Sequence, residues 1–197
     1  KIVKLVRVDS PNLLIFVQGS WEIGDNERNL AASKKIAEDG LASILLYESS
    51  RDWDALQHAG SQEEWVRAFG NKNYHEELAE LKALIEYVKK EYSVEEIFLS
   101  GSSFGGGLAI LESDSVSRLL LSCPQIHCPE YGRISIYQGF PDIEQFLDAI
   151  SQFHGRLRII HGDNDDRVPV NHSIELYKRV GTKDKRFVLL PGNHTFG

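Results

Sequence analysis

A short glycine-rich segment, residues 101–105, constrains the fold more than any other part of the sequence. It reads Gly-Ser-Ser-Phe-Gly and fits the pattern G-x-S-x-G. The apolar run at residues 94–100 predicts a buried strand before the motif, and residues 106–111 predict the start of a helix after it. A strand that turns so sharply into a helix needs small residues on both sides, because Cβ atoms there would clash. The pattern predicts a strained turn that exposes the hydroxyl of Ser103.

Two segments further along the chain end in the residue types that a serine nucleophile requires. On its own the motif also fits an ordinary glycine-rich loop. However, the strand predicted at residues 156–160 leads into the string H-G-x-x-D-x-x-V-P, which contains Asp165, and the strand predicted at residues 187–190 is followed by His194. A serine hydroxyl is a weak nucleophile until an imidazole takes its proton, and a carboxylate holds that imidazole in the useful tautomer. The three residue types together indicate acyl-transfer chemistry.

The order Ser, Asp, His at the ends of successive strands resembles the α/β-hydrolase superfamily, and the string around Asp165 resembles the acid loop of that family. The resemblance runs from about residue 12 to residue 194. By motif position it implies that Ser103 is the nucleophile, Asp165 the acid and His194 the base.

The same resemblance implies an oxyanion hole made of two backbone N–H groups. One belongs to Phe104, directly after the nucleophile, and the other to Ser20, in the loop after the strand predicted at residues 13–17. The family often has His-Gly where this chain has Gln18 and Gly19. The hydrogen bonding of this loop is therefore expected to differ from that of the family.

The remaining pattern predicts one α/β domain over residues 1–197, with a mostly parallel, twisted sheet and helices on both faces. Glu76, Glu77 and Glu80 are expected on the solvated face of the helix before the motif. The region from residue 48 to residue 73 lacks a clear period. The other strands are predicted at residues 1–8, 41–47 and 118–121, and the helices at residues 26–38, 63–69, 78–92 and 142–153.

Residues 122–155 lie where many family members insert a lid. The segment is short, which predicts a minimal lid and a shallow, exposed pocket. It is also polar, which predicts a preference for short acyl chains over lipid at an interface. Its polar residues include Glu130, Arg133, Gln138 and Asp142. The aromatic residues that could border the pocket are Trp21, Trp53, Phe104 and Tyr131, although isolated aromatic residues in loops more often pack locally.

Charge and composition exclude several partners. The net charge of −7 argues against nucleic acid and anionic membranes. Cys123, His127 and Cys128 lack the second ligand pair of a zinc site, and the acidic loop around Asp165 lacks the glycine and the final glutamate of an EF-hand. No metal or cofactor is expected. The two cysteines are expected to be free thiols, and the chain to be cytoplasmic, with a removed leader as the alternative because it begins at Lys1.

These observations predict a carboxylesterase that acts on small soluble acyl esters. A thioesterase or a small peptidase or amidase with the same triad is the nearest alternative. A non-catalytic binding protein of the same fold is a third, but it would be expected to lose a member of the triad. The acyl group, the leaving group and the oligomeric state stay open, because the fold and the triad fix a mechanism without fixing a substrate.

Overall fold

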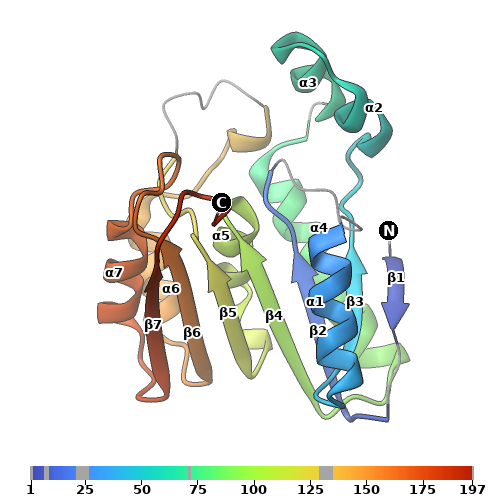
Figure 1. The fold of residues 1–197 in the computed structure, drawn as a ribbon, viewed down its shortest axis with the longest axis vertical. Coiled ribbons are helices and arrows are strands. Elements are labelled where there is room, and N and C mark those ends of the chain that lie inside the picture. Colours follow the sequence, from blue (N-terminus) through green and yellow to red (C-terminus); the bar gives the residue numbers. More distant parts are fainter. Residues whose placement is uncertain (1, 7–8, 21–26, 71, 129–134, 197) are drawn as a thin grey trace.

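The described part of the chain is built around one seven-stranded sheet (Figure 1). The structure is a computed structural model that describes residues 2–6, 9–20, 27–70, 72–128 and 135–196. β1 and β3 pair in antiparallel fashion, and every other neighbouring pair is parallel, so the predicted mostly parallel sheet is confirmed. In spatial order the strands are β1 (Ile2–Val6), β3 (Ser43–Tyr47), β2 (Asn12–Val17), β4 (Glu96–Ser102), β5 (Arg118–Ser122), β6 (Arg156–Gly162) and β7 (Lys185–Leu190).

Helices cover both faces of the sheet, as predicted. α1 (Glu27–Glu38) lies on one face, whereas α4 (Tyr74–Glu91), α5 (Phe104–Leu111) and α6 (Ile143–Ser151) lie on the other (Figure 1). α7 (Asn171–Arg179) packs against α6, β6 and β7. Two short helices, α2 (Trp53–His58) and α3 (Gln62–Ala68), project beyond the carboxyl ends of the strands. Single 3-10 turns span Ser113–Ser115 and Ser135–Tyr137.

The alternating side chains of β2 divide the core into two clusters. Leu13 and Ile15 belong to the larger cluster, which the sheet forms with α4, α5, α6 and α7. Leu14 belongs to a smaller cluster, in which Ala37 of α1 packs against β3. Because successive side chains of a strand point to opposite faces, a strand covered on both faces reads as a continuous apolar run. This explains why the central strands could be recognised in the sequence.

The crossover helix α4 has the predicted apolar stripe, with Leu81, Ile85 and Val88 fully buried. A capping box formed by Asn73 and Glu76 fixes its N-terminus. The predicted solvated face is wrong at one position, Glu77, whose side chain is only 2% exposed. Arg51, in the loop after β3, is buried with it and holds it there by an ion pair.

Several elements differ from the sequence predictions. α7 and α2 were not expected, because only Ser173 and Leu176 of α7 are buried and α2 has just six residues. β3 begins at Ser43, two residues later than predicted, and Leu41 is 59% exposed. Parts of the first predicted strand and of the first predicted helix, at residues 1, 7–8 and 26, lie outside the described residues.

The segment between β5 and β6 is described at residues 122–128 and 135–155, where α6 is its helix. Phe104, proposed to border the pocket, is fully buried and packs edge-on against Tyr74 and Tyr137. Trp53 is the first residue of α2. The other residues proposed for this region, Trp21, Glu130, Tyr131 and Arg133, lie outside the described residues.

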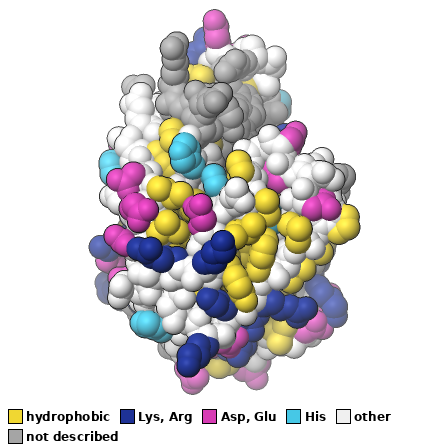
Figure 2. Space-filling model, turned by 90° about the vertical axis from the view of Figure 1, so that its left-hand side faces the viewer, with side chains coloured by type: hydrophobic (Ala, Val, Ile, Leu, Met, Phe, Trp, Pro, Cys, Tyr) yellow, Lys and Arg dark blue, Asp and Glu magenta, His cyan; other side chains and the backbone are white. Residues whose placement is uncertain are grey.

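Apolar side chains reach the surface at the β5–β7 end of the sheet. Leu120 of β5 and Leu190 of β7 are each 37% exposed, and Leu189 is 51% exposed. Figure 2, which views the molecule from the side of β7 and α7, shows apolar side chains gathered there beside lysine and arginine side chains. Within the described residues, none of the helices is both long enough and apolar enough to cross a membrane.

Candidate active site

Ser103 lies at a strained turn between β4 and α5, as the motif predicts. Its backbone has φ 51° and ψ −118°, in a region that residues other than glycine rarely adopt. A Cβ atom at Gly101 would come within 2.6 Å of the Gly105 carbonyl oxygen. The strand and the helix can approach this closely only because residue 101 is glycine. The turn leaves Ser103 partly exposed at the carboxyl edge of the sheet.

The main chain of Ser103 is tied to the neighbouring strand. Its N–H donates to the carbonyl oxygen of Ser122 at 2.9 Å, and its own carbonyl oxygen accepts from the N–H of Gln125 at 3.0 Å. The N–H of Gly106 also donates to this oxygen, at 2.9 Å. These bonds offset the cost of the strained backbone and hold the turn in one conformation.

The two residues predicted to supply the oxyanion hole come from adjacent strands. Ser20 follows β2 and Phe104 follows β4, and their exposed fractions are 1% and 0%. A Cβ atom at Gly105 would overlap the carbonyl oxygens of Val17 and Gln18. The loop after β2 therefore approaches the start of α5 as closely as two backbones can.

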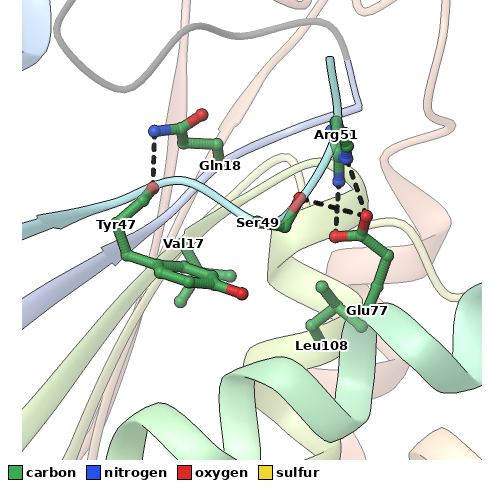
Figure 3. A pocket seen from close by; sticks show the side chains of 7 residues that line it. All are labelled: Val17, Gln18, Tyr47, Ser49, Arg51, Glu77 and Leu108. Atoms are coloured by element: carbon green, nitrogen blue, oxygen red, sulfur yellow. Dashed lines mark hydrogen bonds and ion pairs between the residues drawn. The ribbon is translucent and has the colours of Figure 1, made fainter. Parts of the chain in front are cut away.

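Gln18, at the position where the sequence departs from the pattern His-Gly, lies in this loop. Its side-chain nitrogen Nε2 donates to the carbonyl oxygen of Tyr47 at 2.8 Å, as Figure 3 shows. The side chain of Ser20 contacts Tyr137, with 3.2 Å between the two hydroxyl oxygens. Gln18 thus ties the loop after β2 to the last residue of β3.

Asp165, the predicted acid, lies in the loop after β6 with a side chain only 1% exposed. One carboxylate oxygen, Oδ1, accepts from the N–H groups of Arg167 and Val168, each at 2.9 Å. The other, Oδ2, accepts from His194 Nδ1 at 2.7 Å. Burial alone would raise the pKa of Asp165, but the hydrogen bonds from Val168, His194 and Arg167 outweigh it and lower that pKa. The carboxylate is therefore ionised when it meets His194.

His161 supports the same carboxylate from within the core. Its Nε2 lies 2.9 Å from the carbonyl oxygen of Val168 and 3.2 Å from Asp165 Oδ2. A carbonyl oxygen can only accept, so we assign the ring proton to Nε2, and Nδ1 then accepts from Ser173 Oγ at 2.7 Å. Burial lowers the pKa of His161 and favours the neutral ring. The sequence predicts a structural role for this residue, and its contact with Asp165 adds a link to the site.

The loop that carries His194 is fixed by the acidic residue two positions before Asp165. The exposed Asp163 accepts from the N–H of Gly192 at 3.0 Å through its carboxylate, while its own N–H donates to the carbonyl oxygen of Leu190 at 2.9 Å. Asp166 is exposed as well. Of the three clustered acids, Asp165 is thus the one that contacts His194.

Of the three residues of the predicted triad, Asp165 and His194 are joined by a hydrogen bond, and Ser103 lies at the same edge of the sheet. Among the described residues, Ser103 and His194 share no hydrogen bond. Ser103, Asp165 and His194 follow β4, β6 and β7, which are parallel strands whose carboxyl ends share one edge of the sheet. Catalytic hydrogen bonds in unliganded enzymes are often long and shorten only when substrate binds.

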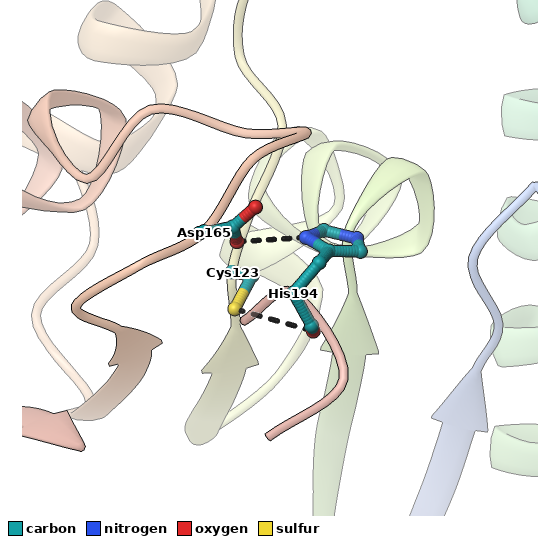
Figure 4. Close-up of side chains that lie close together, drawn as sticks. All are labelled: Cys123, Asp165 and His194. Carbon is teal, nitrogen blue, oxygen red and sulfur yellow. Dashed lines mark hydrogen bonds and ion pairs between the residues drawn. The ribbon is translucent and has the colours of Figure 1, made fainter. Parts of the chain in front are cut away.

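A cysteine accompanies the acid and the histidine (Figure 4). Donor atoms of Cys123, Asp165 and His194 all lie within 4.8 Å of one another, and Cys123 has a left-handed φ of 45°. These are ligand types that zinc accepts, and the sequence did not predict that they meet. However, burial and the nearby Asp165 raise the pKa of the Cys123 thiol to about 12, and the other two residues already bind each other. A protonated thiol is a poor ligand, so this set fits a metal poorly.

No family model and no curated protein sequence match the chain. Its structure is similar to many solved ones, among them the following three, each matched over nearly the whole of this chain. The monoacylglycerol lipase of Paleococcus ferrophilus has a TM-score of 0.71 at 14% identity, covering 97% of this chain and 89% of that one. Est1E of Butyrivibrio proteoclasticus with bound ferulic acid has a TM-score of 0.68 at 20% identity, covering 94% of this chain and 82% of that one. The dienelactone hydrolase of Anabaena variabilis has a TM-score of 0.68 at 15% identity, covering 98% of this chain and 81% of that one.

Proposed function

We propose that this chain, which has the α/β-hydrolase fold, is a serine hydrolase that cleaves small soluble acyl esters as a carboxylesterase. Ser103 is the nucleophile, His194 the general base and Asp165 the acid. The observation that carries the proposal is the 2.7 Å hydrogen bond between His194 Nδ1 and the buried carboxylate of Asp165. It gives the ring a tautomer whose Nε2 is free to accept a proton, at the sheet edge where the strained turn presents Ser103.

In this mechanism Ser103 Oγ attacks the carbonyl carbon of the ester while its proton passes to His194 Nε2. The imidazolium that forms is stabilised by Asp165, whose lowered pKa keeps it negative. The tetrahedral oxyanion accepts hydrogen bonds from the N–H groups of Phe104 and Ser20. His194 then returns the proton to the leaving alcohol, and water repeats the sequence on the acyl-enzyme.

An ester substrate is favoured over a thioester or an amide by the solved structures of the same fold. Those described above are named as a lipase and a lactone hydrolase, and Est1E was determined with a carboxylic acid, ferulic acid, bound. A thioesterase or a small peptidase with the same triad remains the second candidate, because the three side chains would act in the same way on those acyl groups.

We expect hydrolysis of p-nitrophenyl esters to be fastest with short acyl chains and to show no jump when a substrate passes its solubility limit. The segment between β5 and β6 carries exposed polar residues such as Gln138 and Asp142, which do not form the apolar cover of an interfacial lipase. The measurement is kcat/KM for a series of p-nitrophenyl esters, thioesters and aminoacyl amides at matched acyl length. Faster cleavage of the thioesters or amides would replace the ester assignment, and a preference for long chains would contradict the predicted pocket.

A further inference from the structure

A buried ion pair lies behind the predicted oxyanion hole. Arg51 follows β3, Glu77 lies in the first turn of α4, and both side chains are 2% exposed. They form two parallel hydrogen bonds, from Nε to Oε1 at 2.8 Å and from Nη2 to Oε2 at 2.9 Å (Figure 3). Removing such a pair from water is so costly that well-packed apolar residues often give equal or greater stability. Its presence in the core therefore points to a role other than stability.

The third nitrogen of the Arg51 guanidinium reaches the loop after β2. Nη1 donates to the carbonyl oxygens of Ser20, at 3.1 Å, and of Gly19, at 3.3 Å. The same guanidinium lies 5.4 Å from the centre of the Phe104 ring. One side chain thus contacts both residues whose N–H groups are predicted to bind the oxyanion.

The contact with Gly19 has a direct geometric consequence for Ser20. The carbonyl group of Gly19 and the N–H group of Ser20 belong to the same peptide unit, which is planar and trans. In a trans peptide the C=O and N–H bonds point in opposite directions. Fixing the Gly19 oxygen on the Arg51 side therefore fixes the direction of the Ser20 N–H on the other side.

We propose that Arg51, held by Glu77, is a positioning residue that orients the Ser20 N–H toward the oxyanion of the acyl-transfer reaction. The inference rests on the proposed function, because an oxyanion forms only if the chain performs this chemistry. The bidentate bond to Glu77 fixes the plane of the guanidinium, and that plane directs Nη1 to the loop. Ser49 Oγ donates to Glu77 Oε1 at 3.0 Å and Lys72 Nζ lies 3.0 Å from the same oxygen, so the carboxylate is itself held from two sides.

The charge state of the pair supports this role. Burial alone would raise the pKa of Glu77, but Arg51 and Lys72 outweigh it and lower that pKa. Glu77 is therefore a carboxylate at neutral pH, and the guanidinium remains positive. The guanidinium of Arg51 donates to the carbonyl oxygen of the Gly19–Ser20 peptide. A positive group on that side of the peptide makes the Ser20 N–H a stronger donor to the oxyanion.

The test is Arg51→Lys, which keeps the charge but loses the planar fork that joins Glu77 to the loop. We expect kcat for a short p-nitrophenyl ester to fall about 100-fold with little change in KM, as when one oxyanion-hole donor is lost. The affinity of a trifluoromethyl ketone, which forms a tetrahedral oxyanion on the serine, should fall with kcat. The matched control is Arg118→Lys on β5, where Arg118 pairs with Glu96 at 2.9 Å and lies over the Phe98 ring. It should leave kcat and ketone affinity near wild type.

Glu77→Asp provides a second test should Arg51→Lys fail to fold, because it keeps the charge while it pulls the carboxylate back from the guanidinium. It should also lower kcat and ketone affinity together. A folded Arg51→Lys or Glu77→Asp with wild-type kcat and ketone affinity would overturn the positioning role while the wild type stays an active hydrolase. A wild-type protein that neither hydrolyses esters nor reacts with a fluorophosphonate would instead overturn the proposed function, and this inference with it.

Discussion

Replacement of Ser103 by alanine is expected to lower kcat by a factor on the order of 10⁶, comparable to the loss of the nucleophile from a known serine hydrolase. The reason is that this variant lacks the hydroxyl that would form the acyl-enzyme with help from His194. The measurement is kcat on a short p-nitrophenyl ester at saturating concentration, with thermal unfolding of both proteins as a check on folding. Alanine tolerates the backbone of residue 103, at φ 51°, about as well as serine does.

The adjacent Ser102 offers a matched control. It is the last residue of β4 and carries the same hydroxyl one position before the turn. Ser102→Ala should keep activity close to wild type. Activity that survives in Ser103→Ala but disappears in Ser102→Ala would move the nucleophile to the neighbouring residue.

Replacement of Asp165 by asparagine is expected to lower kcat by about 10⁴-fold with little change in the fold. An amide in place of the carboxylate favours the wrong tautomer of His194 and no longer stabilises the imidazolium. The measurement compares this variant with Asp163→Asn and Asp166→Asn, whose carboxyl groups are exposed and away from His194 Nδ1. Those two variants should lose far less activity.

The ranking of the three variants is the informative result. Asp163 accepts a hydrogen bond from the N–H of Gly192 in the His194 loop. Asp163→Asn keeps an acceptor oxygen but removes the charge, so it weakens this support of the loop without touching His194. If Asp163→Asn lowered kcat as much as Asp165→Asn does, the order of the His194 loop, and not the carboxylate charge beside His194, would limit the rate. A larger loss in Asp166→Asn would show that the acid had been misidentified.

The parts of the site that could be predicted from the sequence are those whose residues lie within one short, contiguous motif. The strained turn at Ser103 needs glycines at fixed positions beside it, and Asp165 lies at a fixed position in its loop. Because parallel strands present their carboxyl ends at one edge, the order of the strands was enough to predict that these loops meet. Because the side chains of β2, β3 and β4 are little exposed, these strands could be recognised in the sequence as apolar runs.

The parts that did not follow depend on packing between distant segments. Arg51 and Glu77 are 26 residues apart, and no local pattern shows that the end of β3 meets the first turn of α4. Glu77 was expected in solvent because its neighbours on the helix are charged. One signal was available: Arg51 lies in the loop after a buried strand, and a charged residue that is buried there must find a partner. Cys123 was likewise weighed with its sequence neighbours, although its spatial neighbour is Asp165.

The central claim, that Ser103 is an activated nucleophile, is tested most directly by covalent labelling. A fluorophosphonate loses fluoride when an activated serine oxygen attacks its phosphorus, and the site of the new bond can be read by mass spectrometry of the digested protein. We expect one label per chain on Ser103, lost in Ser103→Ala and much slower in Asp165→Asn. Label on Ser102, or no label on a folded protein that hydrolyses esters, would contradict the mechanism.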